Sequence, residues 1–390
     1  MGKKFVLAPD SFKESLSAIQ ACQAMTKGIL AVFPDADVCS FPMADGGEGT
    51  VDALLQALGG KRIDLTVSGP LVKEQVRAYY GWFPKQQLAV VEMAKANGLE
   101  LLASSKRNPL RTSSYGTGQL IRHALNQGAK RIILGLGGSA TNDGGAGMAQ
   151  ALGLSFIGQD QQILPAGLSG GTLAEVSALD VTALDSRLAQ TEIILACDVT
   201  NPLLGPSGAS QIFGPQKGAT AQMIPILEEN LKHYARLLQQ AVGRDVALQA
   251  GAGAAGGLGA SLLALTNAQW QLGSNLIADL LDLEGAIKKA DYVFTGEGRI
   301  DGQTAFGKVP LGVANLAQKY NKPVYACVGQ IDQGSAKLYQ AGITAIFSLV
   351  PGPISLPDAL AQGAVHLETT VENICRLLAS SQAPSLTFRP

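Results

Sequence analysis

Most of the side chains that could do chemistry in this sequence lie in five short polar turns. The turns are PDSFK (9–13), ADGGEG (44–49), GGSATNDGG (137–145), DVTNP (198–202) and TGEGRIDGQT (295–304). Each turn follows a run of residues that is typical of a buried β-strand. Because ligands of open α/β sheets bind beyond the carboxyl ends of the strands, the turns are predicted to contribute to one binding site.

The turn at 137–145 lies in a stretch, 135–153, that holds seven glycines. Glycine permits positive φ angles and close approach of the backbone to a ligand, and a following helix offers unpaired N–H groups. These features predict an anion-binding loop, with phosphate as the expected ligand. The alternative is a tight strand-to-helix turn capped by Asn142 or Asp143, and the two interpretations are compatible.

Five acidic side chains in the turns suit phosphoryl transfer, which needs Mg²⁺, neutralising cations and a group that positions or deprotonates the attacking hydroxyl. They are Asp10, Asp45, Asp198, Glu297 and Asp301. Each also has a structural interpretation as a cap or turn residue, such as the D-x-x-E pair of Asp45 with Glu48. Their convergence in strand-end turns favours a site.

Basic side chains are scarce in the turns, so Lys13 and Arg299 stand out. Lys13 is predicted to hold a carboxylate or a phosphate, and Arg299 to grip a phosphate through two hydrogen bonds. Solvated surface charge is the alternative for both. The three histidines lie in helical stretches away from the turns, which argues against histidine catalysis.

Three glycine motifs fit nucleotide-binding patterns incompletely. GLGGSA (135–140) and GAGAAG (251–256) fit dinucleotide patterns, but neither has the acidic residue that would hold a ribose. GQTAFGKV (302–309) ends in Val309, where a P-loop has Ser or Thr. An NAD-dependent hydroxy-acid dehydrogenase and a Walker-type loop are therefore disfavoured. The small residues at 251–260 are expected to serve helix and loop packing.

The elements that position the turns alternate between strands and helices at both ends of the chain. Strands at 5–8 and 38–41, each followed by a helix, begin a parallel sheet, and the βαβ rhythm resumes from residue 290. Between these ends, β-rich runs at 63–67, 76–83 and 88–93 are spaced as an antiparallel meander.

The sequence therefore predicts an α/β fold with two domains. A doubly wound, Rossmann-like domain is expected to be split into 1–60 and 286–380. Residues 61–285 are expected to form an inserted α/β domain that contains the meander and the glycine-rich loops. Residues 381–390 are expected to be a C-terminal tail.

Composition argues against several other classes of protein. Hydrophobic residues make up 46% and charged residues 16%, and the formal net charge of −1 offers no basic surface for nucleic acid. The uncharged stretch 246–278 is broken by polar residues and glycines, so no membrane span is predicted. Five separated cysteines encode no disulfide framework, which fits a cytoplasmic location.

Nine blocks occur in order between residues 8 and 304: APDSFKES, MADGGEGT, VVEMA, LGGSATNDGGAGM, ACDVTNPL, GPSGA, FGPQKG, GAAGGLG and TGEGRIDGQT. Together they resemble the bacterial type I glycerate kinase family. The resemblance implies a two-domain α/β kinase that phosphorylates D-glycerate with ATP and Mg²⁺. Members of this class are associated with 2-phosphoglycerate, so attack by the 2-hydroxyl is expected, with the 3-hydroxyl as the alternative.

The resemblance covers the motif positions and assigns no catalytic duties to them, so the roles that follow are hypotheses from the chemistry that such a kinase needs. Lys13, Asp198 and Asp301 are expected to be catalytic, and Asp198, Glu297 and Asp301 to bind Mg²⁺. Substrate binding is expected of Asp10, Ser11, Asp45 and Asn201, and nucleotide binding of Gly137, Gly138, Ser139, Asn142 and Arg299. A non-enzymatic sensor of sugar acids or nucleotides is a further alternative, and the oligomeric state is left open.

Overall fold

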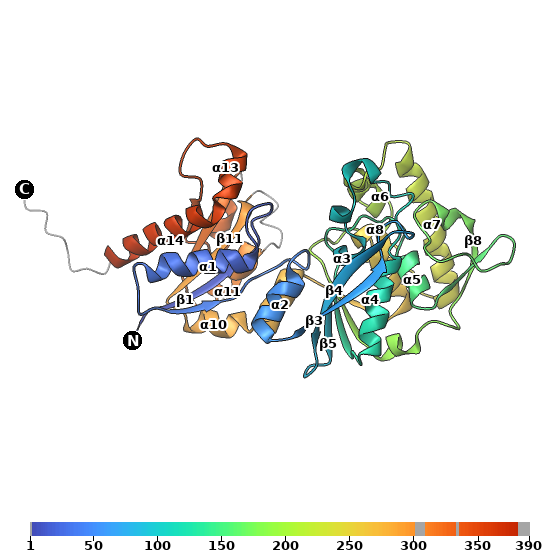
Figure 1. The fold of residues 1–390 in the computed structure, drawn as a ribbon, viewed down its shortest axis with the longest axis horizontal. Coiled ribbons are helices and arrows are strands. Elements are labelled where there is room, and N and C mark those ends of the chain that lie inside the picture. Colours follow the sequence, from blue (N-terminus) through green and yellow to red (C-terminus); the bar gives the residue numbers. More distant parts are fainter. Residues whose placement is uncertain (1, 301–308, 333–334, 381–390) are drawn as a thin grey trace, which may run out of the picture. The chain divides into compact units, whose positions relative to one another are not determined.

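The computed structural model describes residues 2–300, 309–332 and 335–380. Its contacts divide the chain into two compact units (Figure 1): unit 1 comprises Met1–Asp45 with Ser274–Pro390, and unit 2 comprises Gly46–Gly273. Unit 1 therefore consists of two separated stretches of the chain, and unit 2 of the stretch between them. These bounds differ from the sequence-based ones, 60/61 and 285/286, at both junctions.

Unit 1 is built on a five-stranded parallel sheet in the order β13-β12-β11-β1-β2. Its strands are β1 (Lys4–Pro9), β2 (Asp37–Ser40), β11 (Tyr292–Ile300), β12 (Val324–Ile331) and β13 (Ala345–Ser348). Its helices are α1 (Ala18–Leu30), α10 (Leu283–Lys289), α11 (Val309–Gln318), α12 (Ala336–Gln340), α13 (Leu356–Ala361) and α14 (Gly363–Ser380), and α9 (Gly273–Leu280) begins at the junction. Counted within the unit, the strand order is 2-1-3-4-5, the flavodoxin-like doubly wound arrangement.

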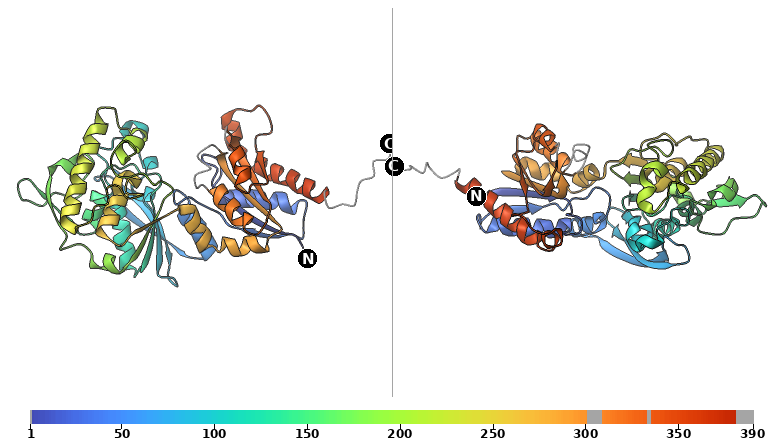
Figure 2. Two further views of the ribbon diagram at one scale, coloured as in Figure 1. Left: turned by 180° about the vertical axis from the view of Figure 1, so that it is seen from behind. Right: turned by 90° about the horizontal axis from the view of Figure 1, so that it is seen from above.

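Helices cover both faces of the unit 1 sheet, as the doubly wound prediction requires (Figures 1 and 2). Neighbouring residues of β12 show this, because Cys327 packs in one core with α1 and α14, whereas Ala326 and Val328 pack in another with α11 and α12. Five successive residues of β1 are buried, which is expected of a parallel strand covered on both faces.

Unit 2 is built on a six-stranded mixed sheet in the order β10-β9-β6-β5-β4-β3. The predicted antiparallel meander is present as β3, β4 and β5, and β5, β6, β9 and β10 run parallel. These strands are β3 (Lys61–Ser68), β4 (Gln75–Phe83), β5 (Leu88–Glu92), β6 (Arg131–Gly135), β9 (Glu192–Ala196) and β10 (Gln269–Gln271). A two-stranded ribbon of β7 (Ser155–Gly158) and β8 (Val176–Asp180) lies at the periphery of the unit (Figures 1 and 2).

The helices of unit 2 pack around this sheet and around one another. They are α2 (Thr50–Leu58), α3 (Ala94–Asn97), α4 (Tyr115–Asn126), α5 (Ala146–Ala151), α6 (Ala209–Phe213), α7 (Met223–Val242) and α8 (Ala254–Leu265). Short 3₁₀ turns are η1 (Leu99–Leu101), η2 (Ser104–Lys106), η3 (Thr172–Glu175), η4 (Ser186–Gln190) and η5 (Pro215–Lys217). No helix within 2–300, 309–332 and 335–380 is both long enough and apolar enough to cross a membrane.

The first junction falls before residue 46 because α2 packs on the meander. The Tyr79 hydroxyl of β4 donates a hydrogen bond to Asp52 Oδ2 at 2.9 Å, and Glu92 at the end of β5 accepts one from the Val51 amide at 2.7 Å. At the second junction, α10 packs on β1, so the residues that lead into it belong to unit 1. The predicted tail, 381–390, lies outside the described residues.

Candidate functional site

The carboxyl ends of β1, β2 and β11 bring three carboxylates together in unit 1. The strand order reverses between β1 and β11, and ligands of doubly wound sheets bind at this point. Asp10 follows β1 and donates its amide to Gly296 O at 2.9 Å, one residue before Glu297. The chain after β2 stays beside β1, because the Met43 amide donates to Pro9 O at 2.9 Å, and it carries Asp45 to the same edge.

Mutual repulsion marks this carboxylate cluster of Asp10, Asp45 and Glu297. Burial, together with the charges of Asp45 and Glu297, raises the pKa of Asp10 to about 8, against the opposing effects of the Ser11 amide and the Lys13 ammonium. The Ser11 amide donates to Asp10 Oδ1 at 2.6 Å. An excess of buried negative charge favours a proton, a cation or a hydroxyl donor at this place.

The two predicted basic residues of unit 1 lie in different surroundings. Lys13 is exposed, and its charge acts on Asp10. Arg299 is also exposed, and its guanidinium binds Asp332 at the end of β12, with Nε 2.6 Å from Oδ2. Asp301 and Lys308 lie outside the described residues. The structure therefore places Asp10, Ser11, Lys13, Asp45 and Glu297 together, and gives Arg299 an ion-pair partner.

Close packing of the backbone accounts for several glycines of the 135–153 stretch in unit 2. A Cβ on Gly135 would lie 2.3 Å from Gly46 O, and one on Gly137 would lie 2.8 Å from Gly47 Cα. The chain at 46–47 therefore fits against the end of β6 only because both segments lack side chains. The turn itself is exposed at Gly138, where φ is +73°, and buried from Ser139 to Ala149.

Asp143 is fully buried and binds the start of α5, although the N-cap residue of this helix is Gly145 and not Asn142 or Asp143 as the alternative interpretation had it. Its Oδ2 accepts hydrogen bonds from the Ser114 amide and hydroxyl at 2.8 and 2.7 Å and from the Gly147 amide at 3.3 Å. Its Oδ1 accepts from the Gly145 amide at 3.1 Å. Burial raises the pKa of this carboxyl, and the four hydrogen bonds oppose the rise. Asp143 thus already accepts a hydrogen bond from the first turn of α5.

The exposed part of the turn retains hydrogen-bond donors. Among the described residues, the amides of Gly137, Gly138 and Ser139 donate to no backbone carbonyl, whereas the Ala140 amide donates to Asn97 O at 2.9 Å. Successive amides around a residue with positive φ form a concave anion-binding arrangement. Phosphate binding at this turn stays a prediction, and the donors available for it are the amides of residues 137–139, not the helix that follows.

Asn142, Asp198 and Asn201 occupy supporting positions. Asn142 is fully buried, and its Nδ2 donates to Ser210 Oγ at 3.1 Å. Asp198, after β9, is partly exposed and accepts the Gly273 amide at 3.1 Å. Asn201 Nδ2 donates to Ser207 O at 2.8 Å. All three lie in unit 2, beside the ends of its parallel strands.

The GAGAAG motif serves packing, as expected. Ala255, Gly256 and Gly257 have positive φ angles inside α8, and the Gly144 amide donates to Gly256 O at 2.9 Å. A Cβ on Gly256 would lie 2.0 Å from Thr141 O. The motif is buried against the glycine-rich turn, so it offers no surface to a dinucleotide.

Sequence reasoning missed Lys217, which is only 2% exposed and lies directly behind the turn. Its Nζ donates to Ser139 Oγ at 2.8 Å and to Thr141 O at 2.6 Å. Burial lowers its pKa to about 7, and the Asp143 charge opposes this effect. The residue lies in the FGPQKG block, but nothing in that block shows that its partners are 76 and 78 residues away.

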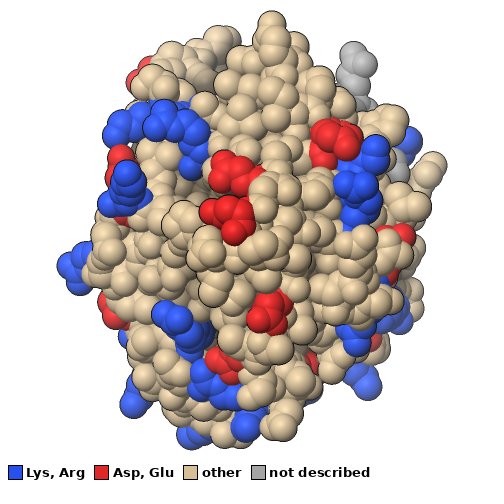
Figure 3. Space-filling model, turned by 90° about the vertical axis from the view of Figure 1, so that its right-hand side faces the viewer, with Lys and Arg blue, Asp and Glu red and all other residues tan. Residues whose placement is uncertain are grey.

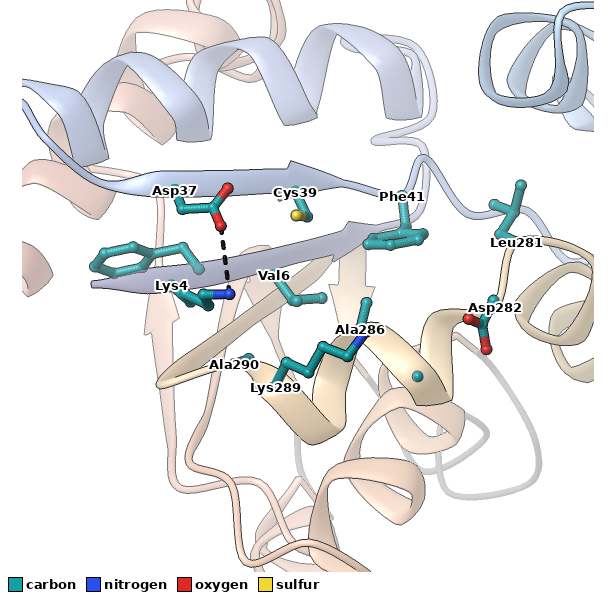
Figure 4. Close-up of a pocket in the computed structure, with 12 residues that line it drawn as sticks. Lys4, Val6, Asp37, Cys39, Phe41, Leu281, Asp282, Ala286, Lys289 and Ala290 are labelled. Atoms are coloured by element: carbon teal, nitrogen blue, oxygen red, sulfur yellow. Dashed lines mark ion pairs between the residues drawn. The ribbon is translucent and has the colours of Figure 1, made fainter. Parts of the chain in front are cut away.

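A pocket in unit 1, of about 240 Å³, lies beside α10 (Figure 4). It is lined by the first residues of β1, and Lys4 pairs there with Asp37, with Nζ 3.8 Å from Oδ2. Lys289 and Asp282 also line it, so charges of both signs are present. On the face of the molecule shown in Figure 3, basic and acidic side chains are likewise interspersed. Neither feature matches the strand-end chemistry described above.

The chain is similar to known proteins along nearly its whole length. Residues 5–379 match the glycerate kinase family. Glycerate kinase of Bacillus subtilis (strain 168) is 49% identical over 371 residues, which cover 95% of this chain and 96% of that protein. Glycerate 2-kinase of Escherichia coli (strain K12) is 48% identical over 373 residues, which cover 96% and 95%. The crystal structure of a protein from Salmonella typhimurium LT2 that is assigned as glycerate kinase 2 matches with a TM-score of 0.87 and 46% identity, over 98% of this chain and 100% of that chain.

Proposed function

The chain belongs to the glycerate kinase family and is a kinase that uses an alcohol group as acceptor; we propose that it transfers the γ-phosphoryl group of Mg-ATP to the 2-hydroxyl of D-glycerate. The product is then 2-phosphoglycerate. The observation that carries the choice of hydroxyl is the similarity to E. coli glycerate 2-kinase along nearly the whole of both chains. The family and the α/β fold predicted from the sequence are confirmed.

D-glycerate is assigned to the carboxylate cluster of unit 1. Lys13, which is exposed, is the proposed partner of the substrate carboxylate. Asp10 and Asp45 offer acceptors to its hydroxyl groups, and Ser11 completes the turn. Because the Asp10 pKa is raised to about 8, this side chain takes up a proton near neutral pH more readily than an ordinary aspartate. Asp10 is therefore well suited to exchange a proton with a substrate hydroxyl.

The triphosphate is assigned to residues 137–139 of unit 2, where three amides lack a backbone acceptor among the described residues. Asn142 is proposed to support this turn from beneath through Ser210. Arg299 remains a proposed phosphate ligand, and it must exchange Asp332 for the phosphate. Asn201 remains a proposed substrate contact.

Mg²⁺ is commonly held by one or two carboxylates together with phosphate oxygens and water. In the part of the chain that the structure describes, no group of three His, Cys, Asp or Glu side chains is arranged to hold a metal ion. Asp198 and Glu297 nevertheless offer the oxygen donors that suit an ion carried by the nucleotide, and Asp301 is the third proposed ligand. When bound, the ion neutralises charge on the phosphoryl group. Asp198 and Asp301 are also the proposed groups that orient the attacking hydroxyl.

One experiment tests this function directly. The protein is incubated with Mg-ATP and D-glycerate, and phosphorus NMR distinguishes 2- from 3-phosphoglycerate. We expect 2-phosphoglycerate and one equivalent of ADP. Formation of 3-phosphoglycerate overturns the assignment of the hydroxyl, and absence of ADP release overturns the activity. A change in NADH absorbance with a hydroxy acid would instead indicate the dehydrogenase.

A cytoplasmic location is proposed from the five cysteines, all of which are free thiols.

A further inference from the structure

We propose that Lys217 is a positioning residue for the nucleotide: it fixes Ser139 so that the serine hydroxyl donates its proton to a phosphate oxygen at the 137–139 turn. The inference rests on the proposed function, because it requires a phosphate-bearing ligand at that turn. It concerns a side chain for which sequence reasoning gave no role.

Lys217 is held in a fixed position behind the turn. Lys217 ends η5 and extends its ammonium group behind the turn, where it donates to Ser139 Oγ at 2.8 Å and to Thr141 O at 2.6 Å. The next residue, Gly218, has a φ of +91°, and a Cβ there would lie 2.4 Å from Arg107 O. The backbone around Lys217 is therefore held in place, and the direction of the side chain follows from it.

The lysine determines where the hydroxyl proton of Ser139 can go. Since Ser139 Oγ accepts from the lysine, its own O–H is left to donate elsewhere. No other hydrogen-bond partner of this hydroxyl is present among residues 2–300, 309–332 and 335–380. Ser139 is 6% exposed and adjoins Gly138, the exposed residue of the turn. The hydroxyl and the three amides thus form one set of donors, which suits the tetrahedral oxygens of a phosphate.

Burial of the Lys217 ammonium costs free energy. Lys217 is 2% exposed, so its ammonium loses most of its hydration, and Asp143, whose charge acts on it, already accepts four hydrogen bonds. An apolar side chain of similar length would fill the same space without this loss. Packing alone therefore does not explain a lysine here, whereas its hydrogen bonds to Ser139 Oγ and Thr141 O do.

The test is a double-mutant cycle on the full-length protein with Lys217→Met, Ser139→Ala and the combined variant. Each single substitution is expected to raise the KM for ATP about tenfold, since a hydrogen bond to a charged ligand is lost, with little change in the KM for D-glycerate. The combined variant is expected to match the single ones, because both remove the same hydrogen bond. Lys232→Met, on the exposed face of α7, is the matched control and should leave both constants unchanged.

Two further measurements separate the possible failures. The affinity for Mg-ADP, measured by calorimetry, should fall by a similar factor in Lys217→Met and needs no reaction with glycerate. Thermal unfolding identifies a variant that is merely misfolded. If Lys217→Met is misfolded, Ser139→Ala carries the test, and Lys217→Arg, which retains a charge that can reach Ser139, is expected to keep most of the affinity for Mg-ADP. Additive effects, an unchanged affinity for Mg-ADP or a change confined to the KM for D-glycerate overturn the proposal. A wild-type protein that binds Mg-ADP but does not phosphorylate glycerate overturns the proposed function alone.

Discussion

The carboxylate cluster of unit 1 and the Asp143 network of unit 2 use the same residue type in opposite ways. Asp10 and Asp143 both lie in the turn that follows a parallel strand, β1 or β6, and both have a raised pKa. Asp143 accepts four hydrogen bonds from its own unit, whereas Asp10 accepts one from the Ser11 amide and faces Asp45 and Glu297. The comparison shows that the surrounding donors, and not the residue type, decide whether an acidic side chain supports the fold or a ligand.

The largest expected effect is a loss of stability when Asp143 is replaced. Asp143→Asn places an NH₂ group among donors, so we expect unfolding in urea to show a loss of about 3 kcal/mol. Asp245→Asn is the control, since Asp245 is exposed and its carboxylate accepts the Ala247 amide at 3.1 Å. Equal and small effects in the two variants would show that the four hydrogen bonds are not needed by unit 2.

The next effect is the pH dependence that Lys217 gives to unit 2. Its pKa is about 7 in the folded protein against 10.5 for an ordinary lysine, so the unfolded chain binds more protons between these values. The free energy of unfolding should therefore rise with pH there, by about 1 kcal/mol per pH unit from this group. The measurement is the difference in stability between wild type and Lys217→Met from pH 8 to 10. A constant difference would mean that the lysine stays protonated in the folded state.

In unit 1 a smaller change in stability is expected, and it is a gain where replacement of Asp143 gives a loss. Asp10→Asn removes repulsion from Asp45 and Glu297, so the protein at pH 7 should gain about 1 kcal/mol of stability. The turnover rate should fall at least about tenfold, because a group that exchanges protons with the substrate is lost. Asp35→Asn, at an exposed position of the same unit, should change neither. A destabilised Asp10→Asn variant would put Asp10 in the same class as Asp143.

The smallest effect concerns the exposed pair of Arg299 with Asp332. Arg299→Gln should change stability by less than about 1 kcal/mol, as is usual for ion pairs in solvent. The KM for ATP should rise about threefold if the guanidinium leaves Asp332 for a phosphate. Asp332→Asn breaks the same pair while keeping the arginine, and its KM for ATP should not rise. Identical results for both variants would assign Arg299 to the surface alone.

Much of the fold could be predicted from local patterns. The run at 5–8 lies within β1, and those at 63–67, 76–83 and 88–93 cover most of the meander, because β-branched and apolar residues are separated there by clear turn signals. The limits of the two units could not be predicted. Whether α2 packs on β1 or on the meander depends on tertiary partners such as Glu92, which a run of helical residues does not reveal.

The candidate site could likewise be predicted only in part. Strand-end turns identified Asp10, Asp45 and Glu297 as neighbours, because the sheet order brings those ends together. The same logic could not distinguish glycines that meet a ligand from those that meet a backbone, such as Gly135 and Gly256. It also missed Lys217, since burial of a charged side chain depends on residues far away in the sequence. The roles of the predicted site residues remain proposals.

The pairing of β1 with β11 has a consequence for synthesis on the ribosome. Phe5 aligns with Tyr292 and Pro9 with Gly296, so the central strand pair of unit 1 cannot form until nearly three-quarters of the chain has been translated. At about 5–20 residues per second, β1 and α1 wait roughly 15 to 60 seconds for their partner. Unit 2 is continuous and is completed before unit 1, so it is expected to fold while apolar residues such as Leu7 and Met25 still require protection by chaperones.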